Sequence, residues 1–354
     1  MSIDVVHAAH VHQAHNCRAV ANWLFTLCGM ILVMVAIGGA TRLTGSGLSI
    51  MEWAPLRGTL PPLSEAEWNR LYDLYRQIPQ YALVNQGFGI EGFKKIFWLE
   101  WLHRLWGRLI GLAFVVPLAV LWWRGAVPRS LLPKLLGLFL LGGMQGAVGW
   151  FMVASGFIPE STAVSPYRLV VHLGLALVLY AAILWTALGL RDGPFGVIGP
   201  RRLVQATAVA AAITILAGGF VAGLRAGLDY NTFPLMAGRL IPDGYARLSP
   251  LLLNWVENIA AVQFNHRALA TVTALLATAS LLAGWNSQAR PGLLVLVVSV
   301  GVQYALGIAT LLYMVPVILG TLHQTVAVVV LTAALVVLHQ LRAQPAPIDG
   351  EYLS

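Results

Sequence analysis

The stretch FWLEWLHRLWGR (residues 97–108) places an acid, a histidine and two arginines at the edge of a long apolar run, and a related stretch, VQFNHRALA, follows at residues 262–270. Only 10% of the 354 residues are charged, and 58% are hydrophobic. This composition is typical of a polytopic membrane protein, because a soluble domain could not bury so much apolar surface. The fold must therefore account for charged side chains repeated at a membrane boundary.

Long apolar runs predict eight transmembrane helices, since a helix needs roughly 20 apolar residues to cross the hydrocarbon core. The runs do not alternate as the strands of a β-barrel would. They lie near residues 20–41, 104–123, 132–153, 166–188, 203–224, 267–285, 292–313 and 317–339. The sequence thus predicts an all-α integral membrane protein.

The net charge of +8 resides largely in short connections, which argues against nucleic acid as a partner. By the positive-inside rule these connections are cytoplasmic, together with the tails 1–19 and 341–354. The long loops 43–98 and 225–265 then lie on the outer face. The basic residues concerned are Arg124, Arg129, Lys134, Arg191, Arg201, Arg202, Arg290 and Arg342.

The eight runs form two matching sets of four, residues 20–190 and 203–340. Self-similarity of this kind indicates duplicated units, and an even number of spans per unit makes the two halves parallel. We therefore expect two parallel-repeat four-helix bundles side by side. The matched segments are GGATRLTGSGL (38–48) with GGFVAGLRAGL (218–228), MQGAVG (144–149) with VQYALG (302–307), and VVHLGLALVL (170–179) with TLHQTVAVVV (321–330).

Four histidines occupy corresponding positions in the two sets. His103 and His266 open their spans, while His172 and His323 lie a few residues inside theirs. All four should lie near the outer face, two in each bundle. Ionisable groups in spans are costly and usually functional, and two imidazoles in a four-helix bundle suit haem iron. Hydrogen-bonded packing residues are the alternative, and zinc is disfavoured because it would need four ligands.

Small and basic residues surround these histidines. Glycines at 38–39, 142–143, 146 and 149 leave room for a flat macrocycle or serve plain helix packing. Arg42, Arg104 and Arg267 are candidate partners of haem propionates, with lipid headgroups as the alternative partners.

The two halves differ beside the first histidine of each. Glu100 stands three residues before His103, whereas Gln263 stands before His266. This difference suggests chemistry in the first half and a resident cofactor in the second. The alternative role for Glu100 is an ion pair with Arg104 or Arg108.

The outer loops carry helix signals of their own. Ser64 and Glu67 have the spacing of a capping box, and the helix they begin should end at Pro79. Residues 254–264 are expected to form a similar helix over the second bundle. Cys17 and Cys28 are poorly placed for a disulfide, and the N-terminal histidines are read as a solvated tail. Those histidines are His7, His10, His12 and His15.

Taken together, five segments resemble the haem A synthase family in its proteobacterial and mitochondrial branch. The resemblance covers about residues 20–340. It implies oxidation of the C8 methyl group of haem O to a formyl group by successive hydroxylations, which makes haem A for cytochrome oxidase. The segments are GGATRLTGSGLS (38–49), EWLHRLWGR (100–108), NTFPLMAG (231–238), ENIAAVQFNHRALA (257–270) and LHQTVAV (322–328).

The same resemblance implies roles for single residues. His103 and His172 would hold the substrate haem O, and His266 and His323 would hold a haem b cofactor. Glu100 matches the carboxylate that the family requires for catalysis. Another bacterial branch carries a cysteine pair in the first outer loop, and residues 43–98 of this chain contain no cysteine.

The resemblance also implies a setting in the bacterial cytoplasmic (inner) membrane. The supplier of substrate would be haem O synthase, the protohaem farnesyltransferase, and cytochrome oxidase assembly factors would be further partners. A homo-oligomer is left open. Two other functions remain open from the residues alone. A dihaem b-type electron-transfer cytochrome would need haems at two depths, and a haem transporter would need broken helices near the midplane.

Overall fold

The structure is a computed structural model in which residues 3–54, 57–159, 161–191 and 196–342 are described, with side chains from residue 16 onward. This part of the chain contains no strand, and eight of its helices are long and apolar enough to cross a membrane. The long helices are α1 (Ile3–Leu43), α4 (Gly89–Trp123), α5 (Leu132–Ala154), α6 (Pro166–Gly189), α7 (Arg201–Gly223), α8 (Ile259–Ala283), α9 (Arg290–Leu312) and α10 (Val317–Gln340). The shorter elements are α2 (Glu65–Tyr75), α3 (Pro79–Leu83) and the 3-10 turns Arg57–Thr59, Ser155–Phe157, Ala226–Leu228 and Leu251–Trp255.

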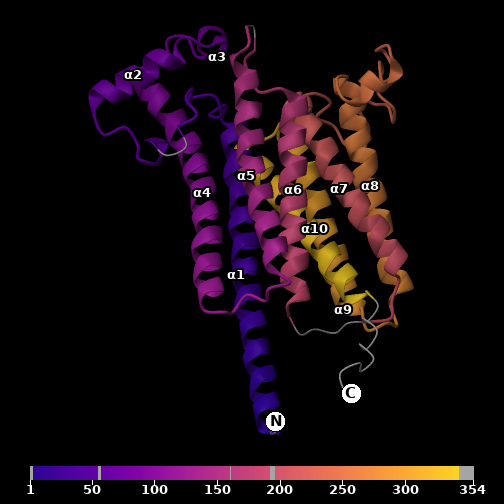
Figure 1. Cartoon of the computed structure of the whole chain (residues 1–354). Helices are drawn as coiled ribbons and strands as arrows, with labels where there is room; N and C mark the ends of the chain where they lie inside the picture. The colour runs from indigo at the N-terminus through magenta and orange to yellow at the C-terminus, as the bar shows by residue number, and fades with distance from the viewer. Residues whose placement is uncertain (1–2, 55–56, 160, 192–195, 343–354) are drawn as a thin grey trace.

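The long helices stand side by side, and both long loops lie at the same end of the molecule (Figure 1). The connections between α4 and α5 and between α8 and α9, the start of α1 and the end of α10 lie at the opposite end. Arg124, Arg201 and Arg290 are at helix ends on that side, where the positive-inside rule places the cytoplasm.

Each half packs as a ring of four helices. In the first half α1 contacts α4 and α6, and α5 contacts α6 and, less extensively, α4. In the second half α7 and α9 each contact both α8 and α10. The halves meet where α1 packs on α10 and α6 packs on α7. These contacts place α4 diagonally opposite α6, as α8 is opposite α10.

Helix α4 starts well before the predicted span. It begins at Gly89, so the last residues of the predicted loop 43–98 are helical. Phe93, Ile96 and Phe97 extend its apolar face past the predicted span and pack against Leu71 and Tyr75 of α2. This contact with α2 explains why a 35-residue helix exceeds the roughly 20 residues that a bilayer requires. At the N-terminus, α1 begins at Ile3, so most of the predicted tail 1–19 is helical, while the side chains of its histidines lie outside the described part.

Of the two loop-helix predictions, the first is confirmed in its start but not in its end, because α2 ends at Tyr75 and Pro79 begins α3. The second prediction is wrong. The Ser64 side chain accepts a hydrogen bond from the Glu67 backbone N–H at 3.2 Å and caps α2. Residues 254–264 do not form a separate helix. The Asn258 side chain accepts hydrogen bonds from the backbone of Ala260 and Ala261, so α8 begins there and continues into the membrane.

The arrangement predicts the membrane orientation. A reporter enzyme that is active only outside the cytoplasm should be active when fused after Arg239, in the second long loop, and inactive when fused after Arg290, at the start of α9. Activity assays of the two fusions in whole cells check this expectation. The reverse pattern would invert the orientation and place the histidines near the cytoplasmic face.

Candidate functional site

Each of the four histidines lies against a glycine on a neighbouring helix of its own bundle. A Cβ atom placed on any of these glycines would come within 2.9 to 3.0 Å of the Cε1 atom of the histidine. Real Cβ atoms rarely approach another atom within 3.4 Å and essentially never within less than 3.0 Å, so each ring occupies the space that the missing side chain leaves. The pairs are Gly38 with His103, Gly149 with His172, Gly218 with His266, and Gly307 with His323.

The second pair of histidines has a ring spacing that is compatible with two ligands to one metal ion. The ring centroids of His266 and His323 are 6.3 Å apart, and the rings are nearly perpendicular, at 89°. A metal bonded to one nitrogen of each ring at about 2.0 Å places the two centroids about 6 Å apart. The residues present therefore fit a haem bound through both axial positions between α8 and α10.

Hydrogen bonds at the Nδ1 atoms determine which ring nitrogen carries the proton in each histidine of this second pair. Nδ1 of His266 is 3.0 Å from the backbone oxygen of Thr214, so it carries the proton and leaves Nε2 free for a metal. Nδ1 of His323 is 3.1 Å from the amide nitrogen of Gln303, whose Oε1 is buried without a hydrogen-bond partner. Turning this amide over brings Oε1 onto Nδ1–H, which satisfies both groups and frees Nε2 of His323 as well.

The first pair of histidines is held less completely. Gln145 approaches His172 with its amide nitrogen 3.2 Å from Nδ1 and 3.1 Å from the backbone oxygen of His172. Nδ1 of His103 is buried and has no protein partner. One ligand of this pair thus lacks the hydrogen bond that orients an imidazole towards a metal.

Glu100 is a buried carboxylate whose two oxygens are both engaged. The residue is 2% exposed. Its Oε2 accepts hydrogen bonds from the backbone N–H of Ser49 at 2.6 Å, from the Ser49 hydroxyl at 2.7 Å and from the Ile50 N–H at 2.9 Å. Its Oε1 accepts from the Arg104 guanidinium at 2.6 Å. The alternative prediction, an ion pair with Arg104, is present, and the carboxylate also fastens the start of the first outer loop.

Gln263 holds the corresponding position in the second half, but the hydrogen-bond polarity is reversed. Its amide NH₂ donates to the backbone oxygens of Ala226 and Asp229, each at 2.6 Å. Its Oε1 accepts from Arg267 at 2.6 Å. The first loop presents N–H groups to an acid, whereas the second loop presents carbonyl oxygens to an amide. Glu100, which only accepts hydrogen bonds, and Gln263, which also donates them, therefore each match the backbone groups of the loop that they contact.

The three arginines predicted to meet propionates all contact backbone oxygens. Arg104 donates to Ile50 and Glu52, and Arg267 donates to Tyr230 and Thr232, with distances of 2.6 to 2.9 Å. Arg42 donates to the oxygens of Ala222 and Gly223 at the end of α7, at 2.8 and 3.3 Å. The Nε atoms of Arg42 and Arg267 are buried and have no protein partner. A propionate role for these residues stays a prediction.

Sequence reasoning missed the two glutamines that contact the histidines. Gln145 and Gln303 occupy the same place in the matched segments MQGAVG and VQYALG, so the repeat itself contained the signal. Their distance from the histidines in the chain hid the contact. In the part of the chain that is described, no three His, Cys, Asp or Glu side chains converge, so the donor set is that of paired imidazoles.

Comparison with known proteins gives a consistent result. The COX15-CtaA family, described as cytochrome oxidase assembly protein, matches residues 21–335. The chain belongs to this family. It is 62% identical over 337 residues to a haem A synthase of Granulibacter bethesdensis, covering 93% of this chain and 89% of that protein. It is 49% identical to a haem A synthase of Rhodospirillum centenum, over 93% of this chain and 90% of that one. It is 47% identical to a haem A synthase of Nitrosospira multiformis, over 92% and 94%. The segment that matches the COX15-CtaA family contains all four histidines of this chain.

The contact between Gly307 and His323 generates a test within one helix. Gly307→Ala adds a methyl group 2.9 Å from the ring, whereas Gly301→Ala, also on α9, adds one that meets nothing within 4 Å. Overpacking costs about 1–3 kcal/mol, which weakens binding roughly 5–150-fold. We expect the first variant to lose bound haem and the second to keep it, as measured by haem content per purified protein. Equal haem content in the two variants would show that the ring tolerates displacement.

Proposed function

We propose that this chain is a haem A synthase, an oxidoreductase that acts on a CH group by converting the C8 methyl of haem O into the formyl group of haem A. The observation that carries the proposal is the 62% identity, over 93% of the chain, to a protein of that name. The paired histidines of each half support it. Each hydroxylation replaces one C–H bond of the methyl carbon by C–OH with oxygen from water, and it releases two protons and passes two electrons to an external electron acceptor. The gem-diol formed by the second hydroxylation loses water to leave the formyl group.

In this proposal the two bundles divide the work. His266 and His323 hold a resident haem b, which would supply a one-electron redox centre. The hydrogen bonds of both rings through Nδ1 suit a permanent ligand set. His103 and His172 hold the substrate. Nδ1 of His103 has no hydrogen-bond partner in the protein. A histidine held in this looser way suits a site that must release its product after each turnover.

The proposed setting is a bacterial cytoplasmic membrane with both haem sites in its outer half. Haem O carries a farnesyl chain and partitions into the bilayer, so the class of reaction that supplies it is the farnesyl transfer performed by a haem O synthase. Proteins that assemble cytochrome oxidase would receive the product, in keeping with the description of the family.

The direct test is expression of the chain with a haem O synthase in a host that makes no haem A. Pigment extracted from the membranes should contain haem A, identified by chromatography and by its reduced absorption spectrum. If the extract contains haem O but no haem A while the protein is present at its normal level, the proposed activity is contradicted.

The division of the bundles predicts unequal histidine variants. His266→Ala and His323→Ala should lose most of the haem b that copurifies with the protein, since each removes an axial ligand. His103→Ala and His172→Ala should retain it and instead lose haem O and haem A. Haem analysis of the four purified proteins decides the matter, and equal loss of haem b from all four would contradict the assignment.

Glu100 is proposed to stabilise charge, or to take a proton from attacking water, at the oxidised carbon. The carboxylate lies in the outer half of α4, one helical turn from His103. Its hydrogen bonds to Ser49 and Ile50 give it a competing role as a support for the loop. Both roles predict a defect when the charge is removed, so a matched variant is needed to separate them.

Glu100→Gln should keep haem b and accumulate haem O or a partly oxidised intermediate, because loss of one acid–base group costs roughly 10²–10⁴ in rate. Ser49→Ala removes one donor to the same carboxylate and keeps its charge, and it should make nearly normal haem A. Pigment analysis of both variants separates the roles. Near-normal haem A from Glu100→Gln, or an equal loss from Ser49→Ala, would leave Glu100 as a support for the loop.

A further inference from the structure

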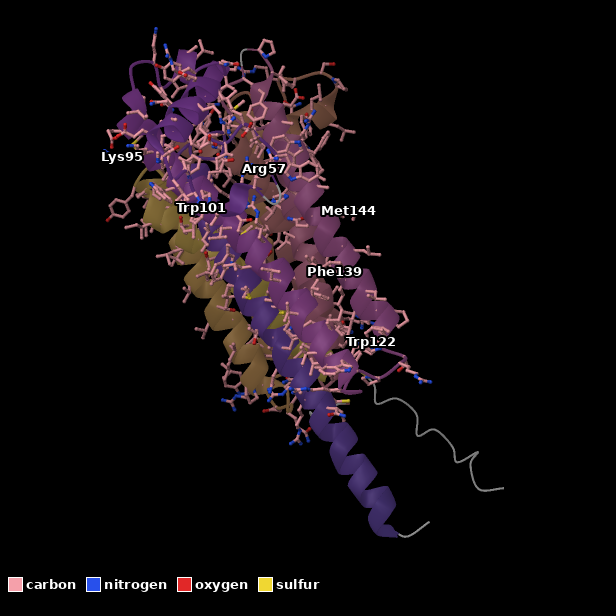
Figure 2. The ribbon with its side chains drawn as sticks, turned by 60° about the vertical axis from the view of Figure 1, so that its left-hand side comes forward. Arg57, Lys95, Trp101, Trp122, Phe139 and Met144 are labelled. Atoms are coloured by element: carbon pink, nitrogen blue, oxygen red, sulfur yellow. The ribbon has the colours of Figure 1, made fainter. Side chains whose placement is uncertain are left out.

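The seam between α4 and α5 is the loosest side of the first bundle. These two helices pack on each other less extensively than any other neighbouring pair within either ring. Neither of them forms a substantial contact with α7, α8, α9 or α10, so the seam faces the lipid. Figure 2, which brings the α4 side forward, shows Trp122 of α4 and the side chains of Phe139 and Met144 of α5 on this exposed surface.

The corresponding seam of the second bundle is bridged at the depth of its histidines. The hydroxyl of Tyr304 on α9 lies 3.0 Å from the hydroxyl of Thr271 on α8. Phe233 of the outer loop packs on the Tyr304 ring, with centroids 6.2 Å apart. Tyrosine and threonine thus join the two helices immediately beside the His266 and His323 pair.

The first bundle has glycine where the second has this tyrosine. In the matched segments MQGAVG and VQYALG, Gly146 corresponds to Tyr304, and Gly111 of α4 corresponds in the same way to Ala274 of α8. A Cβ atom added at Gly146 or at Gly111 would meet no atom within 4 Å. The seam is therefore open beside these two glycines, while Arg108 of α4, which corresponds to Thr271 of α8, extends to the outer loop and donates to the Ala54 backbone oxygen at 2.8 Å.

Aromatic pairs close the α4/α5 seam above and below. On the outer side Trp53 of the loop stacks on Trp150, with centroids 6.0 Å apart. On the cytoplasmic side Phe114 of α4 meets Phe139 of α5, with centroids 5.7 Å apart. The length of α5 between Phe139 and Trp150 is about 16 Å at 1.5 Å per residue. The opening is thus a bounded window rather than a general separation of the helices.

The second bundle has the opposite pattern along its seam. Ala277 and Val297 replace the phenylalanine pair, and a cavity of about 370 Å³ lies there, with Thr271 and Tyr304 among its lining residues. That seam is bridged by Thr271 and Tyr304, and the cavity extends from this bridge to Ala277 and Val297. The first seam is open beside the histidines and filled deeper down.

The two helices that border the α4/α5 window each carry a buried polar atom without a protein partner. These atoms are Nδ1 of His103 on α4 and Oε1 of Gln145 on α5. An unpaired buried polar group costs free energy, so the first bundle suits a ligand that carries polar groups in addition to its apolar chain.

We propose that the α4/α5 window, between the Trp53–Trp150 pair and the Phe114–Phe139 pair, is the subsite through which the isoprenoid chain of the substrate leaves the first bundle and reaches the lipid. The inference rests on the proposed function. A haem ring that carries a long apolar chain can lie between four helices only if one seam lets the chain out. Lipid is as apolar as a protein interior, so the chain needs an open path rather than a fitted pocket. In the second bundle the bridge between Tyr304 and Thr271 blocks this path. The haem proposed for that bundle carries no such chain.

Gly146→Tyr tests the window by giving the first seam the side chain of the second. Purified protein with haem b already in the second bundle is titrated in detergent with haem O and, separately, with haem b as a probe that lacks the chain. Overpacking of about 1–3 kcal/mol should weaken haem O binding roughly 5–150-fold and leave binding of the chainless probe to the first bundle unchanged. Gly137→Tyr, on the same helix but on the cytoplasmic side of Phe139, is the matched control and should bind both probes as the unmodified protein does.

Two results would overturn the proposal. Unchanged haem O binding by Gly146→Tyr shows that the chain does not use the window, and equal weakening of both probes shows that the tyrosine acts on the ring instead. Should Gly146→Tyr lose haem b from the second bundle, and so fail to fold, Gly111→Leu on the opposite wall carries the same expectation. Failure of the unmodified protein to bind haem O at all would count against the proposed function itself. That result differs from a failure of the window proposal, in which the unmodified protein binds haem O and Gly146→Tyr binds it equally well.

Discussion

The four paired imidazoles each lie between two packed helices, against a residue that has no side chain. Helices in contact lie about 8–10 Å apart, which leaves little space for a ring beside an ordinary Cβ atom. The chain provides this space four times, at Gly38, Gly149, Gly218 and Gly307. Each contact joins two neighbouring helices of one bundle and fixes the depth of a histidine in the membrane. The rest of the site is arranged around the four rings that these glycines admit.

The outer loops are tied to the same helices by the arginines that follow two of the histidines. Arg104 and Arg267 each donate to two backbone oxygens of the loop above them. A carbonyl oxygen at a membrane boundary needs a donor, and a planar guanidinium can satisfy two at once. Movement of a loop is therefore coupled to the helix that presents the histidine. Arg42 makes the analogous contact between halves, because it reaches from α1 to the last carbonyls of α7, where the helix dipole favours a cation.

Periodicity and composition were sufficient to predict the membrane helices, because bilayer thickness imposes a length that sequence alone displays. Ser64 likewise predicted the start of α2, since capping is local. The extension of α4 to Gly89 was missed because it depends on packing against α2. The absence of a separate helix at 254–264 was missed because the Asn258 cap competes with a longer helical pattern. For the candidate site, the histidines could be chosen from their repetition, but Gln145 and Gln303 could not, since their partners lie 20 to 27 residues away in the chain.

The two halves share their ligands and differ in what surrounds them. Glu100 and Gln263 each match the polarity of a loop, so exchanging one for the other would bring donors against donors or acceptors against acceptors. Gly146 and Tyr304 differ in whether the seam beside the histidines is open. Four equivalent histidines cannot by themselves distinguish two cofactors from one cofactor and one substrate, because the donor sets are the same. That distinction has to come from positions that correspond in the repeat and do not touch the metal. In the proposed function those positions set the charge beneath the outer loop and the access from the lipid, two properties in which a site that turns over is expected to differ from a site that holds its haem.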